Sequence, residues 1–337
     1  MGRDIPTPFH MQIKNGESEE WIEITEILRV VPGKRITAIS LWREKLVIVK
    51  LFFHPVNWKR NHLNDVRGIK LLIDRDLLTP AILKDTCTKD NRGAVLIMQY
   101  LEQGITLNSL IESARTEIEK YHVIELAISA IADCHKKGIL QEDIHLDNFF
   151  CFNECIYFLD GGNVKAGDNV LLEKHALTNL AVFFAQLNIT VDRNIFSLLE
   201  NYEKRVYPIS KSARTTFIKR VKNARANRLN YIEKKLFRST TAHRNFRTRK
   251  KFVVYDRKLQ SNEFKNLIRN PESYVNEAKI IKAGNASTVM ALSLDNIGYV
   301  LKKYNLKTFW HSIKYLFKPS RAAYSWRNAS VLEVIGI

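Results

Sequence analysis

The sequence has few of the residues that mark the simpler structural classes. Thirteen glycines and eight prolines in 337 residues exclude collagen-like and low-complexity chains. With 45% hydrophobic and 26% charged residues, the chain is too apolar to be disordered throughout. Its length is sufficient to bury more than one hydrophobic core, and we expect about two domains.

Long apolar runs are also missing. No stretch approaches the ~18 apolar residues that cross a bilayer, and the N-terminal residues contain no apolar signal segment. Of four cysteines, only Cys151 and Cys155 are close in sequence, and no second pair or histidine cluster accompanies them. This spacing favours reduced thiols over a zinc site, and the sequence predicts a soluble cytoplasmic protein.

Acidic residues are scarce relative to basic ones, and the difference is local. Lys and Arg number 53 against 35 Asp and Glu, which leaves a net charge of +18. Residues 211–251 contain fifteen basic residues and one acid, Glu233, so they account for +14 of that charge. The chain therefore divides into a nearly neutral front portion, a basic stretch and a tail, and we expect an acidic partner.

The front portion alternates predicted strands and helices. Residues 26–53 are typical of strands with a turn at Pro32-Gly33, and the apolar run 46–53 contains Lys50. A helix over 61–76, a strand over 95–100 and a helix over 117–137 follow. In the last helix, apolar residues at three- and four-residue spacing predict a core stripe of Val123, Leu126, Ala127, Ala130, Ile131 and Cys134.

Polar residues follow this helix in a regular order. Asp143 and Asn148 lie in a short loop, and a strand over 156–159 then ends in Asp160-Gly161-Gly162. An Asp-x4-Asn loop followed by a hairpin and Asp-Gly is typical of protein-kinase-like phosphotransfer sites. There, one carboxylate accepts the proton of the attacking hydroxyl, while an amide and a second carboxylate bind Mg²⁺ against the phosphates. Lys50 would supply a cation for the α- and β-phosphates.

Each of these features has an ordinary interpretation when it is taken singly. Asp-x4-Asn and Asp-Gly are common in solvated turns, and Lys50 resembles an edge-strand lysine. Their order along the chain favours the kinase-like interpretation. His145, between the two functional residues, is expected to be a structural loop residue.

At these residues the sequence resembles bacterial lipopolysaccharide kinases, which phosphorylate heptose or Kdo sugars of the lipid A core. The resemblance covers about residues 28–200. Within that group, the sequence is most similar to the members that have two kinase domains in tandem. The segments that carry it are Arg29–Arg35, Val49–Phe53, Thr79-Pro80, Glu142–Asn148 and Leu159–Gly161.

The resemblance implies a fold and a set of residue roles. The fold would be α+β and two-lobed, with an N-lobe over residues 1–101 and a C-lobe over residues 102–251. Asp143 would be the catalytic base, Lys50 the phosphate lysine, and Asn148 and Asp160 the Mg²⁺ ligands.

The same resemblance assigns the nucleotide-covering loop, and the chain departs from the family pattern at three positions. Gly33, Lys34 and Arg35 would contribute to that loop, and Asp65 would replace the glutamate that pairs with the phosphate lysine. The family has histidine where this chain has Gln141. Glu142 stands at an Arg or Gly position and adds a carboxylate beside the proposed base.

The tail resembles the start of a second domain of the same kind. Residues 279–289 predict a strand, a turn and a strand, and residues 299–305 a strand with Lys302 at the phosphate-lysine position. No second Asp-x4-Asn follows before Ile337. We expect residues 252–337 to form a partial second N-lobe, and the chain to be a truncated tandem-domain member.

The function that the resemblance implies is phosphoryl transfer from ATP, with Mg²⁺, to a sugar hydroxyl of the lipopolysaccharide inner core or another anionic glycolipid. It would act in the cytoplasm, at the inner face of the inner membrane. Two alternatives stay open: a kinase for another small molecule or a protein, and a pseudokinase scaffold that binds anionic lipid or nucleic acid.

The basic stretch has three interpretations. Residues 214–238 have a helical pattern, and Arg225, Arg228 and Lys235 would lie on a cationic face. This face could bind an anionic membrane or glycolipid, bind nucleic acid, or simply be solvated. The membrane or glycolipid interpretation is favoured over nucleic acid.

Overall fold

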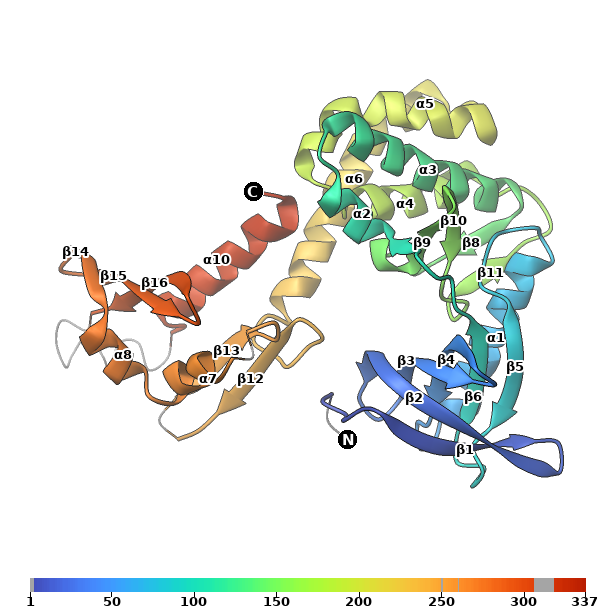
Figure 1. Ribbon diagram of the computed structural model, residues 1–337. Coiled ribbons are helices and arrows are strands. Elements are labelled where there is room, and N and C mark those ends of the chain that lie inside the picture. The colour runs from blue at the N-terminus through green and yellow to red at the C-terminus, as the bar shows by residue number, and fades with distance from the viewer. Residues whose placement is uncertain (1–2, 250, 260, 306–317) are drawn as a thin grey trace. The chain divides into compact units, whose positions relative to one another are not determined.

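Helices and antiparallel sheets are mixed along the whole chain, which confirms the predicted α+β class (Figure 1). The computed structural model describes residues 3–249, 251–259, 261–305 and 318–337. The chain forms two units, Met1–Asn227 and Arg228–Ile337. Their boundary falls within helix α6 (Lys211–Glu233), earlier in the chain than the boundary after residue 251 expected from the sequence.

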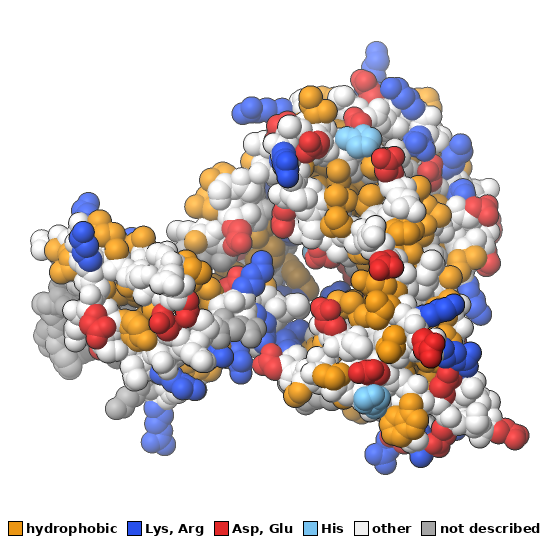
Figure 2. All heavy atoms as spheres, in the orientation of Figure 1, with side chains coloured by type: hydrophobic (Ala, Val, Ile, Leu, Met, Phe, Trp, Pro, Cys, Tyr) orange, Lys and Arg blue, Asp and Glu red, His pale blue; other side chains and the backbone are white. Residues whose placement is uncertain are grey.

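Helix α6 contains much of the basic stretch, and here the structure corrects one expectation. Arg225 does not lie on a cationic face, because its side chain is buried and its guanidinium binds both carboxylate oxygens of Asp192 at 2.8 and 2.9 Å. Lys219 and Lys222 are exposed on the same helix. On the face drawn in Figure 2, Lys and Arg side chains are scattered among acidic ones and form no continuous patch.

Unit 1 begins with a six-stranded antiparallel sheet in the order β1-β2-β3-β4-β6-β5. Hairpin turns join the strands from β1 to β4, and the turn before β3 contains Gly33 at a φ of 67°. The predicted strands over residues 26–53 and 95–100 are confirmed. The bounds are β1 (Phe9–Asn15), β2 (Ser18–Val31), β3 (Arg35–Trp42), β4 (Lys45–Phe52), β5 (Ile82–Cys87) and β6 (Ala94–Gln99).

The sheet curls until its first strand meets its last. Ile13 of β1 forms a bridge with Thr88, just beyond β5, and the Lys89 N–H donates to the Gln12 carbonyl at 3.2 Å. This contact joins the two edge strands at one point, where their backbone groups would otherwise be unpaired. The enclosed face is filled by apolar side chains that alternate along the strands: Ile13, Ile22, Ile24, Val30, Ile36, Ala38, Val47, Val49, Leu51, Val95 and Ile97.

The opposite face of the sheet packs on helix α1 (Trp58–Ile73). Side chains alternate across a strand, so Phe52 of β4 and Leu96 of β6 contact Val66 and Ile69 of the helix. Lys50 has the same parity as Phe52 and therefore also points toward α1. This alternation is what directs a lysine from a buried strand to the helix.

The second half of unit 1 is mainly helical, and α3 lies at its centre. Thr116 caps α3 through the Glu119 N–H, and the Glu119 carboxylate accepts from the Arg115 N–H at 2.8 Å. The α3 helix ends before Gly138, whose φ is 71°. The helices are α2 (Leu107–Ser113), α3 (Glu117–Lys136), α4 (Glu173–Phe184), η2 (Ile189–Asn194), α5 (Ile195–Arg205) and α6.

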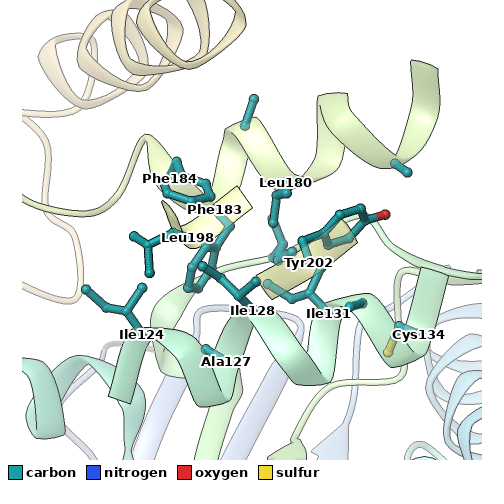
Figure 3. Close-up of a cluster of buried hydrophobic side chains, with 14 of the residues drawn as sticks. Ile124, Ala127, Ile128, Ile131, Cys134, Leu180, Phe183, Phe184, Leu198 and Tyr202 are labelled. Atoms are coloured by element: carbon teal, nitrogen blue, oxygen red, sulfur yellow. The ribbon is translucent and has the colours of Figure 1, made fainter. Parts of the chain in front are cut away.

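The core between these helices corrects the predicted stripe on α3 (Figure 3). Ala127, Ile131 and Cys134 are buried as expected, whereas Val123, Leu126 and Ala130 are only partly buried at its margin. The buried stripe is rotated around the helix axis, and it includes the polar His135. The other core residues that Figure 3 labels come from α3, α4 and α5, and they are Ile124, Ile128, Leu180, Phe183, Phe184, Leu198 and Tyr202.

Short strands hold the loops between α3 and α4. The hairpin of β9 and β10 extends a small sheet with β7, and β11 pairs with β8. The predicted strand over residues 156–159 corresponds to β10, and the predicted Asp-x4-Asn loop contains a single 3-10 turn, η1. The bounds are β7 (Ile105–Thr106), β8 (Ile139–Gln141), η1 (Leu146–Asn148), β9 (Phe149–Phe152), β10 (Cys155–Phe158) and β11 (Val164–Ala166).

Unit 2 contains a second three-stranded antiparallel sheet, β14-β15-β16. The strands predicted over residues 279–289 and 299–305 are confirmed. The bounds are β12 (His243–Arg247), β13 (Phe252–Asp256), α7 (Asn262–Arg269), α8 (Pro271–Glu277), β14 (Lys279–Ala283), β15 (Ser287–Leu294), β16 (Ile297–Tyr304) and α10 (Arg321–Ile335).

Candidate active site

The centre of the candidate site is a buried ion pair between strand β4 and helix α1. Lys50 is 5% exposed and Asp65 is fully buried. The Lys50 Nζ lies 3.2 and 3.1 Å from the two carboxylate oxygens of Asp65, and it also donates to the Leu159 carbonyl at 3.0 Å. A buried charge without a partner would cost several kcal/mol, so each of these groups requires the other.

Helix α1 approaches the Asp160-Gly161-Gly162 turn so closely that side chains are excluded from the contact. A Cβ at Gly68 would lie 1.8 Å from the Gly161 carbonyl oxygen, and one at Gly161 would lie 2.2 Å from the Asp65 carbonyl oxygen. The Gly161 N–H donates to Asp65 Oδ1 at 2.9 Å. Glycine at both positions therefore allows one helix to hold the lysine and the turn together.

Asp160 is the second carboxylate of the site. Its Oδ2 accepts from Arg35 Nη2 at 3.2 Å, and its Oδ1 accepts from the Gly162 N–H at 3.0 Å. Burial alone would raise the pKa of the Asp160 carboxyl. The charges of Lys50 and Arg35, with the Gly162 hydrogen bond, outweigh burial and hold that pKa far below its usual range. Asp160 is therefore ionised at neutral pH.

A backbone hydrogen bond joins the Asp-x4-Asn loop to the residue that precedes this turn. The Asn148 Nδ2 donates to the Asp143 carbonyl at 2.8 Å, and the Asn148 carbonyl accepts from the Leu159 N–H at 3.0 Å. Asn148 is buried, whereas the Asp143 side chain is exposed. His145 Nδ1 accepts from the Asp147 N–H and caps η1, in agreement with the structural role expected for it.

A chain of buried hydrogen bonds supports the loop from below. Gln141 Nε2 donates to the Asp160 carbonyl at 2.6 Å, and Asn179 Nδ2 donates to the Gln141 carbonyl at 2.9 Å. Burial lowers the pKa of His135 to about 4, so its ring is neutral at pH 7. Its Nε2–H then donates to Asn179 Oδ1, while its Nδ1 accepts from the Tyr202 hydroxyl.

The sequence indicated Gln141 only as a departure from a family pattern, and it did not indicate Asn179 or His135. Asn179 lies within α4 and His135 in the last turn of α3, so neither stands out in a polar motif. The one available signal is their position on buried helix faces.

The remaining predicted site residues are arranged differently. Gly33 and Lys34 are exposed at the turn before β3, and among the described residues no hydrogen bond or ion pair joins the Lys34 side chain to the carboxylates. Glu142, the extra carboxylate beside Asp143, pairs with Lys165 at 2.6 Å, which offsets its charge. The structure thus brings together Lys50, Asp65, Asp160 and Arg35. The Asp143–Asn148 loop is joined to the residue before Asp160 by the hydrogen bond from the Leu159 N–H to the Asn148 carbonyl, and Gly33 and Lys34 stay exposed.

The oxygen ligands of the site fit a small divalent cation. Within the described residues, Asn148 Oδ1 has no hydrogen-bond donor, and Asp160 presents an ionised carboxylate. Mg²⁺ prefers such oxygen ligands and is often held by one or two carboxylates with the substrate phosphates. The part of the chain that is described contains no group of three His, Cys, Asp or Glu residues able to hold a metal. Asp160 and Asn148 would therefore need phosphate oxygens to complete a site.

The lysine of unit 2 has different surroundings. Lys302 of β16 is exposed, and its Nζ lies 5.2 Å from the ring centroid of Tyr304. Helix α10, which follows, has one acidic residue, Glu333, in its last turn. No ion pair of Lys302 is found in the described ranges. The described residues of unit 2 therefore contain no counterpart of the Lys50–Asp65 pair.

A cleft of about 720 Å³ lies elsewhere in unit 1, between α3, β10 and residues 76–78, and none of the predicted site residues lines it. All four cysteines are free thiols. The described helices include none that is long and apolar enough to cross a membrane. Neither a protein-family model nor a curated protein matches the chain. A functional proposal therefore rests on the geometry of the site and on its sequence motifs.

Proposed function

We propose that this protein is an ATP- and Mg²⁺-dependent phosphotransferase with a two-lobed protein-kinase-like fold. The curled sheet with α1 would be the N-lobe, and the helical half of unit 1 the C-lobe. One observation carries the proposal. The Lys50 ammonium contacts both the Asp65 carboxylate and the Leu159 carbonyl, and so joins a strand lysine, a helix acid and the turn that contains Asp160.

The positions of the side chains support distinct roles in phosphoryl transfer. Lys50, held by Asp65, would bind the α- and β-phosphates, and Asp143 is exposed where an acceptor hydroxyl can reach it. Asn148 and Asp160 would hold the metal ion. When bound, Mg²⁺ supplies positive charge that neutralises the phosphates as the bond breaks. Apart from that, the chain contributes orientation and a base for the hydroxyl proton.

The face of the sheet that carries Lys50 also has apolar side chains that would suit a nucleotide base. Ile39 of β3 pairs in register with Ile48 of β4, two residues before Lys50, and both side chains are half-buried. Alternation along the strands places them on the same face as Lys50. They would provide an apolar surface for a base whose phosphates extend toward the lysine.

The acceptor that we propose is a sugar hydroxyl of the lipopolysaccharide inner core. This part of the proposal rests on the resemblance of the motif segments to lipopolysaccharide kinases, and the excess of basic residues is compatible with an anionic glycolipid. The reaction would take place in the cytoplasm at the inner face of the inner membrane.

We also propose that the sheet and last helix of unit 2 form a partial second N-lobe without a site of its own. Lys302 is the sixth residue of an eight-residue strand, as Lys50 is, and it pairs with the third residue of the preceding strand, as Lys50 does. Lys302 has no acidic partner among the residues that the structure describes, which supports a non-catalytic role.

Two variants of the purified chain test the proposal, with ATP and core oligosaccharide as substrates. Asp160→Asn should abolish Mg²⁺-dependent nucleotide binding, because it removes the charged metal ligand. Asp143→Asn should leave nucleotide binding intact and reduce transfer by about 10²–10⁴-fold, the usual effect of removing a general base. Equal nucleotide affinity and turnover in all three proteins would refute the assignment. Nucleotide binding without turnover in the wild type would indicate a pseudokinase.

A further inference from the structure

The side chain of Arg35 does more at the site than the nucleotide-covering role expected from the sequence. It lies at the start of β3, directly after the exposed turn, and its side chain is 20% exposed. Nη2 donates to Asp160 Oδ2 at 3.2 Å, and Nη1 lies 3.5 Å from Asp65 Oδ2. The guanidinium therefore spans the two carboxylates at the accessible side of the Lys50–Asp65 pair.

The two carboxylates do not depend on Arg35 to the same extent. Asp65 receives Lys50 on both oxygens and the Gly161 N–H on Oδ1, so it is satisfied without Arg35. Asp160 Oδ1 accepts from the Gly162 N–H, but Oδ2 accepts only from Arg35 within the described residues. The guanidinium thus occupies the oxygen of Asp160 that is not already bound to its own backbone.

This oxygen is the one that a divalent cation would need. A guanidinium and a metal ion both carry positive charge, so their simultaneous contact with one carboxylate oxygen is unfavourable. A guanidinium also matches a phosphate as well as it matches a carboxylate, because its N–H donors form a planar fork. Arg35 can therefore exchange a carboxylate for a phosphate with little loss of hydrogen bonding.

We propose that Arg35 is an exchangeable counter-ion of Asp160, which blocks binding of a metal ion alone and moves to the nucleotide phosphates when a metal–nucleotide complex enters. This inference rests on the proposed function of the site. Its consequence is thermodynamic coupling: phosphates that draw Arg35 from Asp160 raise the affinity for the metal, and the metal raises the affinity for phosphates by the same factor.

The test compares wild type with Arg35→Gln, using Mn²⁺ alone, ATP alone, and both together. Mn²⁺ binding is followed by electron paramagnetic resonance and ATP binding by calorimetry in chelator. Arg35→Gln should bind Mn²⁺ alone about 10- to 100-fold more tightly, the scale on which outer-shell partners alter metal affinity. The same variant should bind metal-free ATP more weakly. The two changes have opposite signs, which loss of folded protein cannot produce.

Three further variants make the outcome specific. Arg43→Gln removes an arginine that pairs with Glu20 on the same sheet, and it should change neither affinity. Adding Asp160→Asn to Arg35→Gln should remove the gained Mn²⁺ affinity, which shows that the ion is bound at Asp160. Arg35→Lys keeps the charge without the fork, so it should weaken ATP binding while Mn²⁺ affinity stays low.

Each result decides the matter. Unchanged or weaker Mn²⁺ binding in Arg35→Gln, in a protein that still binds ATP with Mg²⁺, overturns the role of Arg35 and leaves the proposed function standing. A wild-type protein that binds no nucleotide with or without metal overturns both.

Discussion

Two stretches of this chain fold alike and differ in their chemistry. In unit 1, β3, β4 and α1 place Lys50 in a buried ion pair, whereas in unit 2 the hairpin of β15 and β16 places Lys302 at the corresponding register but leaves it exposed. Both hairpins turn through two left-handed residues, Arg43-Glu44 and Asp295-Asn296. The backbone pattern is thus repeated, whereas the acidic partner has no counterpart in the described part of unit 2.

The comparison shows what a strand lysine needs before it can serve a site. A lysine at the right register stays solvated unless a carboxylate on the following helix and a packed turn take it out of water together. Unit 1 supplies both, through Asp65 and the Gly68–Gly161 contact. The buried apolar side chains among the described residues of unit 2 are Leu236, Met290 and Leu294, a small core by comparison.

The largest difference between the units should be in the loss of unfolding free energy when a helix residue that contacts the lysine-bearing strand is replaced by alanine. Asp65→Ala would leave Lys50 buried without its acid, and we expect a loss of about 3–5 kcal/mol in the unfolding free energy of unit 1. Ser325 of α10, whose hydroxyl contacts the Tyr304 hydroxyl, is the counterpart in unit 2. Ser325→Ala should cost about 1 kcal/mol or less.

Urea unfolding followed by circular dichroism measures both variants against wild type. An Asp65→Ala cost no greater than that of Ser325→Ala would mean that the two lysine environments are energetically equivalent, against the comparison above.

The second prediction uses the buried polar network of unit 1, in which His135 contacts Asn179 and Tyr202. The folded state lowers the pKa of His135 to about 4 through burial, whereas an unfolded histidine titrates near ~6.5. Between these values the unfolded chain binds more protons. The stability due to neutral His135 is therefore complete above about pH 6.5 and is lost as the pH falls toward 4, by about 3 kcal/mol in all.

Calorimetry across this pH range should show the loss in the transition of unit 1, with the transition of unit 2 as an internal reference. His135→Gln, which keeps one donor and one acceptor but does not titrate, should flatten the dependence. An unaltered pH dependence in that variant would show that another group is responsible.

The smallest predicted effect concerns α6, which runs from unit 1 into unit 2. Replacing the exposed Lys219 and Lys222 with Gln should weaken binding to anionic vesicles by about 1 kcal/mol per lysine if that surface lies on the membrane. Arg225→Gln should instead destabilise unit 1, because Arg225 is buried against Asp192. Co-sedimentation with vesicles measures the first effect. Unchanged vesicle binding with a loss of RNA binding would reject the membrane interpretation.

Local patterns were enough to predict many elements of the fold. The apolar run of β4, the extent of α3 and the hairpin of unit 2 all depend on neighbouring residues, and the structure confirms them, although the buried stripe on α3 is rotated from the predicted one. The closing strand β1 was missed because its sequence, FHMQIKN, is mixed in polarity and its partner lies near Thr88. Its role depends on a pairing that no local pattern contains.

The candidate site shows the same limit. The spacing of Asp143, Asn148 and Asp160 was visible because they share one segment of chain. The contact between Arg35 and Asp160 joins residues 125 positions apart, so the sequence indicated Arg35 only as part of the nucleotide-covering loop and not as a partner of Asp160. The sequence placed Arg225 on a surface because a charged side chain is usually solvated, and its partner, Asp192, is 33 positions away.

The measurement that tests the central claim most directly is phosphoryl transfer from ATP by Lys50→Met and Lys302→Met, each compared with wild type. If the protein has one site, built on Lys50, Asp65 and Asp160, then Lys50→Met should remove nearly all transfer. Lys302→Met should leave transfer within a few-fold of wild type, since Lys302 is exposed and has no acidic partner among the described residues. An equally severe loss in Lys302→Met would contradict the one-site account.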